Sequence, residues 1–142
     1  MNALLDDHRY SDAIPYARRV LEIHGQMAGE NSGLYAADLY VLGRIYSLVS
    51  QHDKAEPLYR KALAIQKQLH GPDSLEYAAA LNSLGSVYDD MELYDLAEPQ
   101  FRDALRIRES KLAPNDPKYT ESLNRTFAVE ARFELNSGGV PG

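Results

Sequence analysis

The side chains of this chain that could carry out catalysis or bind a metal are its histidines and carboxylates. The histidines share neither a four-residue spacing nor a common register, and they are His8, His24, His52 and His70. A helical pair of metal ligands needs such a spacing, so the histidines do not predict a metal site. Asp89 and Asp90 are adjacent and would point in different directions on a helix, which disfavours a carboxylate pair for acid–base chemistry.

Other kinds of reactive site are absent from the sequence. The chain has no cysteine, which excludes disulfides, thiolate metal ligands and cysteine nucleophiles. No glycine-rich phosphate loop follows a predicted strand, because the sequence predicts no strand. We therefore expect no enzymatic activity, no metal and no cofactor.

Composition limits where the chain works and what it binds. With 142 residues, of which 44% are hydrophobic and 25% charged, the sequence is typical of one soluble globular domain. It has no uncharged apolar stretch of about 18 residues, the length a membrane span needs. Its opening segment is acidic, unlike a signal peptide, so we expect a cytoplasmic protein without membrane contact. The net charge of −6 opposes contacts with phosphates, so no nucleic acid is expected as partner.

A repeat of 42 residues organises the sequence. Pro15, Pro57 and Pro99 are separated by 42 residues (57 − 15 and 99 − 57), and the residues around them recur in the same register. Each unit holds two segments whose apolar residues fall three or four apart, which predicts two amphipathic helices per repeat. Gly43 and Gly85 recur inside the first helix of a unit, where we expect the second helix of that unit to approach closely.

The periodicity and the capping residues predict an all-α chain. We expect a short stub at residues 2–8 and then about six main helices, at 11–28, 33–50, 53–69, 75–92, 95–112 and 117–135. Ser32, Ser74 and Asp116 are predicted to cap one set of helices, and Ser11, Asp53 and Asp95 the other. The helices would pair as antiparallel helix-turn-helix hairpins and stack into an α-solenoid.

The repeat resembles the tetratricopeptide repeat. The segment Leu84-Gly85-Ser86-Val87-Tyr88, followed by Ala97, Phe101 and Ala104, matches the pattern L-G-x-x-Y then A-x-x-x-F. The 42-residue length and the run from Ala55 to Ile65 are similar to the longer repeat of kinesin light chains and their prokaryotic relatives. This resemblance implies a right-handed superhelix that acts as a protein–protein interaction scaffold.

The resemblance also divides the chain. It implies a single repeat domain over residues 1–135, with units at about 1–31, 32–73 and 74–115, a carboxy-terminal capping helix at 116–135 and a flexible tail at 136–142. The first helix would lack a partner, so an apolar face including Ile14, Ala17 and Leu21 would lie partly open. Self-association through the amino-terminal end, or excision from a longer protein, are the two explanations that we consider for this face.

In this family the first helix of each unit lines a concave groove that binds a peptide. Counting from the Leu-Gly signature, the predicted groove residues are Tyr40, Arg44, Ser47, Asn82, Ser86, Asp89, Asn124 and Arg132. The resemblance implies that an asparagine at the position of Asn82 and Asn124 hydrogen-bonds the backbone of a bound peptide. An amide suits this task because it both donates and accepts. The partner would be a peptide or protein, and the alternatives are a structural self-association module or a regulatory fragment of a larger multidomain protein.

Overall fold

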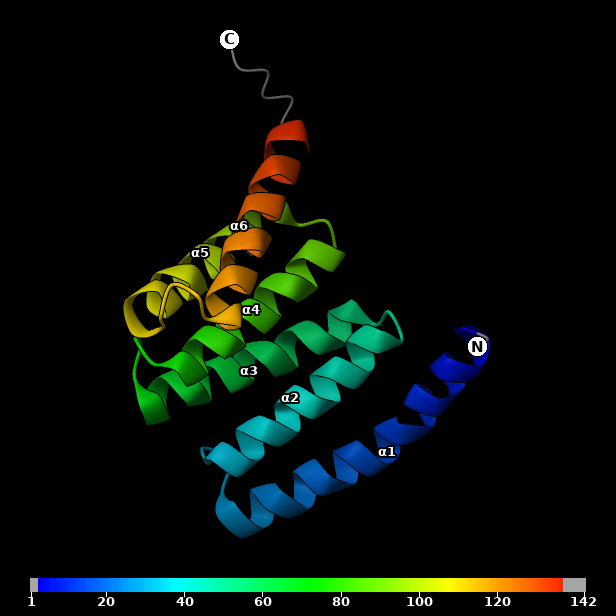
Figure 1. Cartoon of the computed structure of the whole chain (residues 1–142). Helices are drawn as coiled ribbons and strands as arrows, with labels where there is room; N and C mark the ends of the chain where they lie inside the picture. The colour runs from blue at the N-terminus through cyan, green and yellow to red at the C-terminus, as the bar shows by residue number, and fades with distance from the viewer. Residues whose placement is uncertain (1–2, 137–142) are drawn as a thin grey trace. The chain divides into compact units, whose positions relative to one another are not determined.

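The computed structural model describes residues 3–136, with side chains over residues 9–135, and the predicted tail falls outside this range except for Asn136. Over the described residues the chain is all-α with six helices and no strand, which confirms the predicted fold class (Figure 1). The helices are α1 (Ala3–Ala28), α2 (Gly33–Leu48), α3 (His52–His70), α4 (Leu75–Asp90), α5 (Tyr94–Lys111) and α6 (Pro117–Asn136). They form two compact units, α1 to α3 up to Gly71 and α4 to α6 from Pro72 onward.

The first unit is built around α2, which packs against both α1 and α3. Its core consists of buried side chains of α2 and α3, namely Tyr35, Ala36, Leu39, Ala62 and Ile65. Leu21 of α1 packs against this core, so the expectation that its side chain lies on the open face is wrong. In the second unit α5 packs against both α4 and α6, and Phe101 at its centre is only 1% exposed.

Two glycines allow the two helices of a hairpin to approach closely. A Cβ atom on Gly43 of α2 would lie 3.0 Å from the Tyr59 ring of α3. A Cβ atom on Gly85 of α4 would lie 2.9 Å from the Phe101 ring of α5, which is closer than real Cβ contacts. The predicted contact within each repeat is therefore confirmed, and each glycine leaves room for a large aromatic ring on its partner helix.

The start of α1 differs from the expectation. One continuous helix runs from Ala3 to Ala28, so the predicted stub and a separate helix beginning at residue 11 are wrong. Ser11 lies inside α1 and caps nothing, and Pro15 lies inside the helix as well. Pro57 and Pro99 also lie beyond the first turns of α3 and α5, at positions where each removes one helical hydrogen bond.

The caps divide into two groups. Ser32 and Ser74 accept hydrogen bonds from the backbone N–H groups of Tyr35 and Tyr77, both at 3.1 Å, as predicted for α2 and α4. Asp116 accepts from the backbone of the first turn of α6 at 2.9 Å. The expectation for the other set is wrong, because α3 and α5 begin after Gln51 and Leu93, neither of which makes a side-chain cap.

Tight turns explain why α3 and α5 start early. Ser50 and Glu92 adopt left-handed backbone conformations, with φ of 62° and 60°. The next backbone N–H groups, of Gln51 and Leu93, reach back to the carbonyls of Tyr46 and Tyr88 at 2.8 Å. This hydrogen bond closes the end of one helix and leads directly into the next, so Asp53 and Asp95 fall in the first turn instead of at the cap.

Candidate functional site

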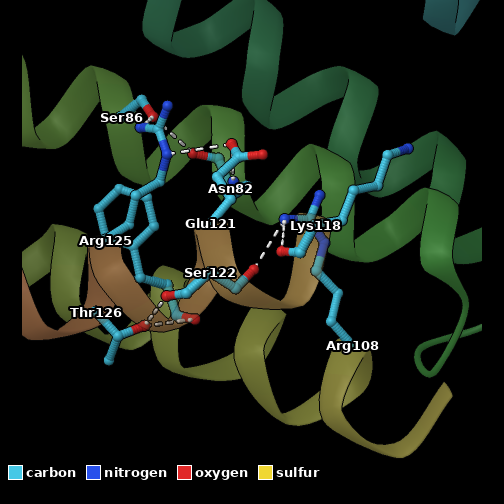
Figure 2. Close-up of polar contacts among 9 residues, drawn as sticks. Asn82, Ser86, Arg108, Lys118, Glu121, Ser122, Arg125 and Thr126 are labelled. Atoms are coloured by element: carbon cyan, nitrogen blue, oxygen red, sulfur yellow. Dashed lines mark hydrogen bonds and ion pairs between the residues drawn. The ribbon is translucent and has the colours of Figure 1, made fainter. Parts of the chain in front are cut away.

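Four polar side chains join α4 to α6 on one face of the second unit (Figure 2). The Asn82 Nδ2 group of α4 donates to Oε1 of Glu121 on α6 at 3.3 Å. One turn further along, Nη1 of Arg125 donates to the Ser86 hydroxyl at 2.6 Å. Arg125 also donates through Nε to Glu121 at 3.2 Å, which links the two contacts. Asn82, Ser86, Glu121 and Arg125 therefore share one hydrogen-bonded network.

A third contact continues the same series. Nη1 of Arg132 on α6 lies 2.8 and 3.0 Å from the two carboxylate oxygens of Asp89 on α4. The hydrogen bond to Asp89 and the negative charge of its carboxylate raise the pKa of the Arg132 guanidinium above its ordinary value, so Arg132 stays positively charged. We call the three contacts, Asn82–Glu121, Ser86–Arg125 and Asp89–Arg132, the α4–α6 ladder.

Asn82 occupies an unusual position within the ladder. A groove residue that binds a peptide is expected on an accessible face, whereas Asn82 is only 6% exposed with Glu121 beside it. Its Oδ1 atom is buried and accepts no hydrogen bond from any described residue. A buried acceptor without a donor costs free energy, on the order of 1–3 kcal/mol. Asn82 therefore keeps an unused acceptor beside an exposed partner, Glu121.

The predicted residues of α2 lie in the first unit and differ from one another in their surroundings. The Tyr40 ring packs edge-on against Tyr59 of α3, with centroids 5.3 Å apart, so this tyrosine is held by the core. Arg44 is exposed, and no described residue pairs with its guanidinium. The hydroxyl of Ser47 is buried and has no hydrogen-bond partner among the described residues.

The ladder thus brings together four of the eight predicted residues, Asn82, Ser86, Asp89 and Arg132. Asn124 of α6 is exposed and stays outside it. Arg125 was missed by the sequence prediction, although Glu121 and Arg125 are four residues apart on one helix, the spacing of a helical ion pair.

A second polar contact was also missed. Arg108 of α5 is 5% exposed, and its Nη1 donates to the hydroxyl of Ser122 at 2.8 Å and to the carbonyl of Lys118 at 3.2 Å (Figure 2). In the first unit His24 of α1 pairs with Asp38 of α2. Both pairs occupy the same register, since 108 − 24 and 122 − 38 are each 84, or two repeats. The signal that could have predicted these contacts is the recurrence of polar residues at this register, His24 and Arg108 on the second helix of a unit and Asp38 and Ser122 on the first helix of the next.

The described residues offer no clear site for other chemistry. Among the side chains that the structure describes, residues 9–135, no three histidine, cysteine or acidic groups gather as metal ligands would. None of the helices described is both long and apolar enough to cross a membrane. What the ladder provides is a row of hydrogen-bond donors and acceptors with opposite charges side by side.

Comparison with known proteins identifies the repeat. The family model described as tetratricopeptide repeat matches residues 2–68 and 49–110, which together cover most of the chain. Repeats of this family generally mediate protein–protein interaction. No curated protein matches the chain.

Solved structures agree with this assignment. BtubC (BKLC) from P. vanneervenii is 25% identical with a TM-score of 0.81, over 93% of this chain and 51% of that one. A putative kinesin light chain of Podosopora anserina with nearly identical TPR-like repeats is 16% identical with a TM-score of 0.84, over 96% of this chain and 66% of that one. The chain thus spans about half of the first relative and less than two thirds of the second. From the family match and the 42-residue unit, the chain belongs to the tetratricopeptide repeat family, with repeats of the kinesin-light-chain-like kind.

Proposed function

We propose that this chain is a non-enzymatic cytoplasmic scaffold that binds a peptide or protein partner through the inner faces of α2, α4 and α6, the helices that line the concave groove in this family. The partner would lie along the first helix of each repeat. The residues that we assign to it are Tyr40, Arg44, Ser47, Asn82, Ser86, Asp89, Asn124 and Arg132.

The α4–α6 ladder is the observation that carries this proposal. An extended peptide presents backbone N–H and C=O groups at regular intervals, and it needs partners of both kinds. The ladder has both kinds in one row, and Oδ1 of Asn82 has no donor among the described residues. A peptide that displaced the exposed Glu121 from Nδ2 of Asn82 would accept from Nδ2 through a carbonyl and donate to Oδ1 through an N–H, so both polar atoms of the amide would be paired.

The remaining groove residues would supply the side-chain contacts. Arg44 and Asn124 are exposed and have no described partner, so a ligand can engage them without breaking an existing contact. Arg44 would attract an acidic group, whereas Asp89 would attract a basic one once Arg132 has moved. We therefore expect a ligand with charges of both signs.

A selection from a random peptide library, with the full chain immobilised, tests the proposal. The affinity of each selected peptide is then measured by fluorescence anisotropy against variants. Asn124→Ala and Arg44→Ala change exposed side chains, so a loss of affinity cannot be attributed to unfolding. We expect each to weaken binding by roughly fivefold or more, the effect of losing one interface hydrogen bond or charge contact.

Asn82→Ala should weaken binding further, and its melting temperature must be measured beside it because Asn82 is buried. Lys67→Ala and Glu109→Ala are the matched controls, since both alter exposed charges on α3 and α5 and should leave the affinity unchanged. If the selected peptides bind Asn124→Ala, Arg44→Ala and Asn82→Ala as tightly as the unaltered chain, the proposed groove is contradicted. A selection that yields no peptide at all would contradict peptide binding itself.

Self-association is the second candidate, favoured by the exposed apolar side chains of α1. Tyr16 and Met27 are each 76% exposed. A regulatory role within a larger multidomain protein is a further alternative, compatible with a chain that spans 51% of one relative and 66% of another.

A further inference from the structure

The outer side of α1 carries a row of exposed apolar side chains. Tyr16, Val20, Ile23 and Met27 are 76, 42, 37 and 76% exposed, and their spacing of four, three and four residues places them on one helical face. Leu21 lies on another side and packs against the core of the first unit. The row is therefore separate from the surface by which α1 holds α2.

The repeat register shows what such a face does elsewhere in the chain. One repeat after Val20 and Ile23 come Ala62 and Ile65 of α3, which are 0 and 3% exposed. Both belong to the core between α2 and α3. Val20 and Ile23 thus occupy positions that elsewhere pack against the first helix of a hairpin, but they are still 42 and 37% exposed.

Helix α6 lacks the opposite hairpin partner, a second helix. Phe127 stands at the register of Gly43 and Gly85, the glycines of α2 and α4 that face the second helix of their hairpins. It is 63% exposed. Helix α6 is therefore a first helix whose hairpin face has no second helix among the described residues, and α1 is a second helix without a first.

The two open faces are complementary in size. In the hairpins of this chain the small residue is on the first helix and the aromatic on the second, as in the pair Gly43 and Tyr59 and the pair Gly85 and Phe101. On the open faces the order is reversed: the first helix has Phe127, and the register of Tyr59 on α1 is filled by Ala17, since 59 − 17 is 42. Exchanging which side holds the ring keeps the combined volume nearly constant, which packing requires.

We propose that α6 of one copy packs antiparallel against α1 of a second copy, forming a hairpin between molecules with Phe127 over Ala17. This interface goes beyond the peptide groove, and neither depends on the other. Leu123 of α6 would lie against Val20 and Ile23, as its counterpart Leu39 lies against Ala62 and Ile65 in the first unit.

A charge contact supports the same pairing. In the first unit, Nζ of Lys61 on α3 lies 5.2 Å from the centre of the Tyr35 ring on α2 and 3.5 Å from its hydroxyl. The equivalent positions on the open faces are Arg19 of α1 and Tyr119 of α6. In the proposed pairing a cation on the second helix again lies near a tyrosine on the first, so the open faces are complementary in this cation–aromatic contact as well as in size.

The lengths of the end helices fit an intermolecular hairpin. Helices α2 and α4 end at Leu48 and Asp90, whose register in α6 is Arg132, yet α6 continues to Asn136. Helices α3 and α5 begin at His52 and Tyr94, whose register in α1 is Tyr10, yet α1 begins at Ala3. Each end helix thus runs straight through the position where a hairpin within the chain turns. Two helices from different molecules need no turn, so both extensions can pair.

The interface joins two different surfaces, because α1 of one copy meets α6 of another. Each copy can use both surfaces, so the assembly either closes into a ring, of which a two-fold dimer is the smallest, or continues as a filament. A capping role for α6 predicts the contrary, a monomer.

Sedimentation velocity of the full chain from micromolar to millimolar concentration tests the proposal. We expect species that grow with concentration. Val20→Asp and Phe127→Asp each place a charge on one open face, and each variant alone should stay monomeric. Their equimolar mixture should form a dimer and nothing larger, because the intact α6 of the Val20→Asp chain can still pair with the intact α1 of the Phe127→Asp chain.

Leu96→Asp in α5 is the control, since Leu96 is 43% exposed, close to the 42% of Val20, but lies on neither open face. It should assemble like the unaltered chain, and circular dichroism should show equal helicity in all variants. Ala17→Tyr should weaken assembly by roughly tenfold, since two rings would then compete for one space. The double variant Ala17→Tyr with Phe127→Gly restores the arrangement of the internal hairpins and should recover it.

Three results would overturn the proposal. An unaltered chain that is monomeric at millimolar concentration would show that the two faces do not meet. Assembly that survives Phe127→Asp but not Val20→Asp would assign the contact to two α1 helices. A double variant no better than Ala17→Tyr alone would show that positions 17 and 127 do not pair.

Discussion

Nη1 of Arg132 on α6 contacts both carboxylate oxygens of Asp89 on α4, at 2.8 and 3.0 Å. The guanidinium side is largely in solvent, with 52% of the Arg132 side chain exposed against 23% for Asp89. Exposed ion pairs contribute little to folding because water screens them and two flexible side chains must be ordered. The pair therefore contributes little to the stability of the unit. Its main effect is that Arg132 occupies the Asp89 carboxylate until a ligand displaces it.

Replacing Arg132 with alanine should consequently leave the melting temperature nearly unchanged and free the Asp89 carboxylate. A peptide with a lysine or arginine, taken from the library selection, should then bind more tightly, by roughly threefold to tenfold for one exposed charge contact. Anisotropy titrations at low and high salt measure this gain, which salt should reduce. Adding Asp89→Asn to Arg132→Ala should remove the gain; if it persists in the double variant, Asp89 is not the group that receives the ligand.

Gly85→Ala tests the close approach of α4 and α5. Alanine normally stabilises a helix interior relative to glycine by roughly 0.5–1 kcal/mol. Here the added Cβ would lie 2.9 Å from the Phe101 ring, and that ring is buried and cannot swing away. We expect a net destabilisation of about 1–3 kcal/mol in urea unfolding, as overpacked cores show. Gly33→Ala is the control, because nothing lies within 4 Å of its Cβ position, and it should be neutral or stabilising.

The repeat made the helices predictable, and local turn geometry limited how well their ends could be placed. Proline and glycine recurring every 42 residues gave the register, and the register gave the close contacts of Gly43 and Gly85. Asp53 was assigned as a cap because its side chain suits one. The chain instead turns through Ser50 at positive φ, a conformation that its side chain does not signal, so α3 starts earlier.

The sequence predicted which residues of α4 belong to the candidate site, but not which side chains of α6 they contact. Counting along α4 selected Asn82, Ser86 and Asp89, and the structure places all three on the side that meets α6. Which side chains of α6 they meet depends on how the two helices pack, and periodicity within one helix contains no such information. Arg125 was therefore missed, and the burial of Asn82 was not foreseen.

Replacing Glu92, the residue with a left-handed backbone in the turn between α4 and α5, should stabilise the protein. Glu92 has φ of 60°, which costs a residue with a Cβ roughly 1 kcal/mol, whereas glycine adopts it freely. Glu92→Gly should raise the free energy of unfolding by up to about 1 kcal/mol, less the entropy that glycine adds to the unfolded chain. Glu109→Gly, in the last turn of α5, should instead lower it, by up to about 1 kcal/mol. Equal effects of the two changes would mean that the turn at Glu92 is unstrained.

Tyr77 should make the second unit sensitive to alkaline pH. Burial raises the pKa of its hydroxyl above the ordinary 10.0, and the negative charge of Asp103 adds to this, partly opposed by Arg106. Because the folded pKa exceeds the unfolded one, the contribution to stability is complete below the unfolded pKa. It is lost as pH rises through the folded pKa. Urea midpoints at about pH 9 and about pH 11 should therefore fall less for Tyr77→Phe than for the unaltered chain. An identical fall in both would show that Tyr77 does not contribute.

The buried guanidinium of Arg108 makes Ser122 important for stability although both lie away from the ladder. Ser122 is fully buried, and its hydroxyl accepts from Arg108 at 2.8 Å. Ser122→Ala leaves the same nitrogen with the Lys118 carbonyl at 3.2 Å and one acceptor fewer, which should cost about 1–3 kcal/mol in urea unfolding. Ser110→Ala removes an exposed hydroxyl that donates only to the backbone, and it should cost little. If Ser122→Ala is as mild as this control, water replaces the lost hydroxyl and the α5–α6 contact is more open than the structure indicates.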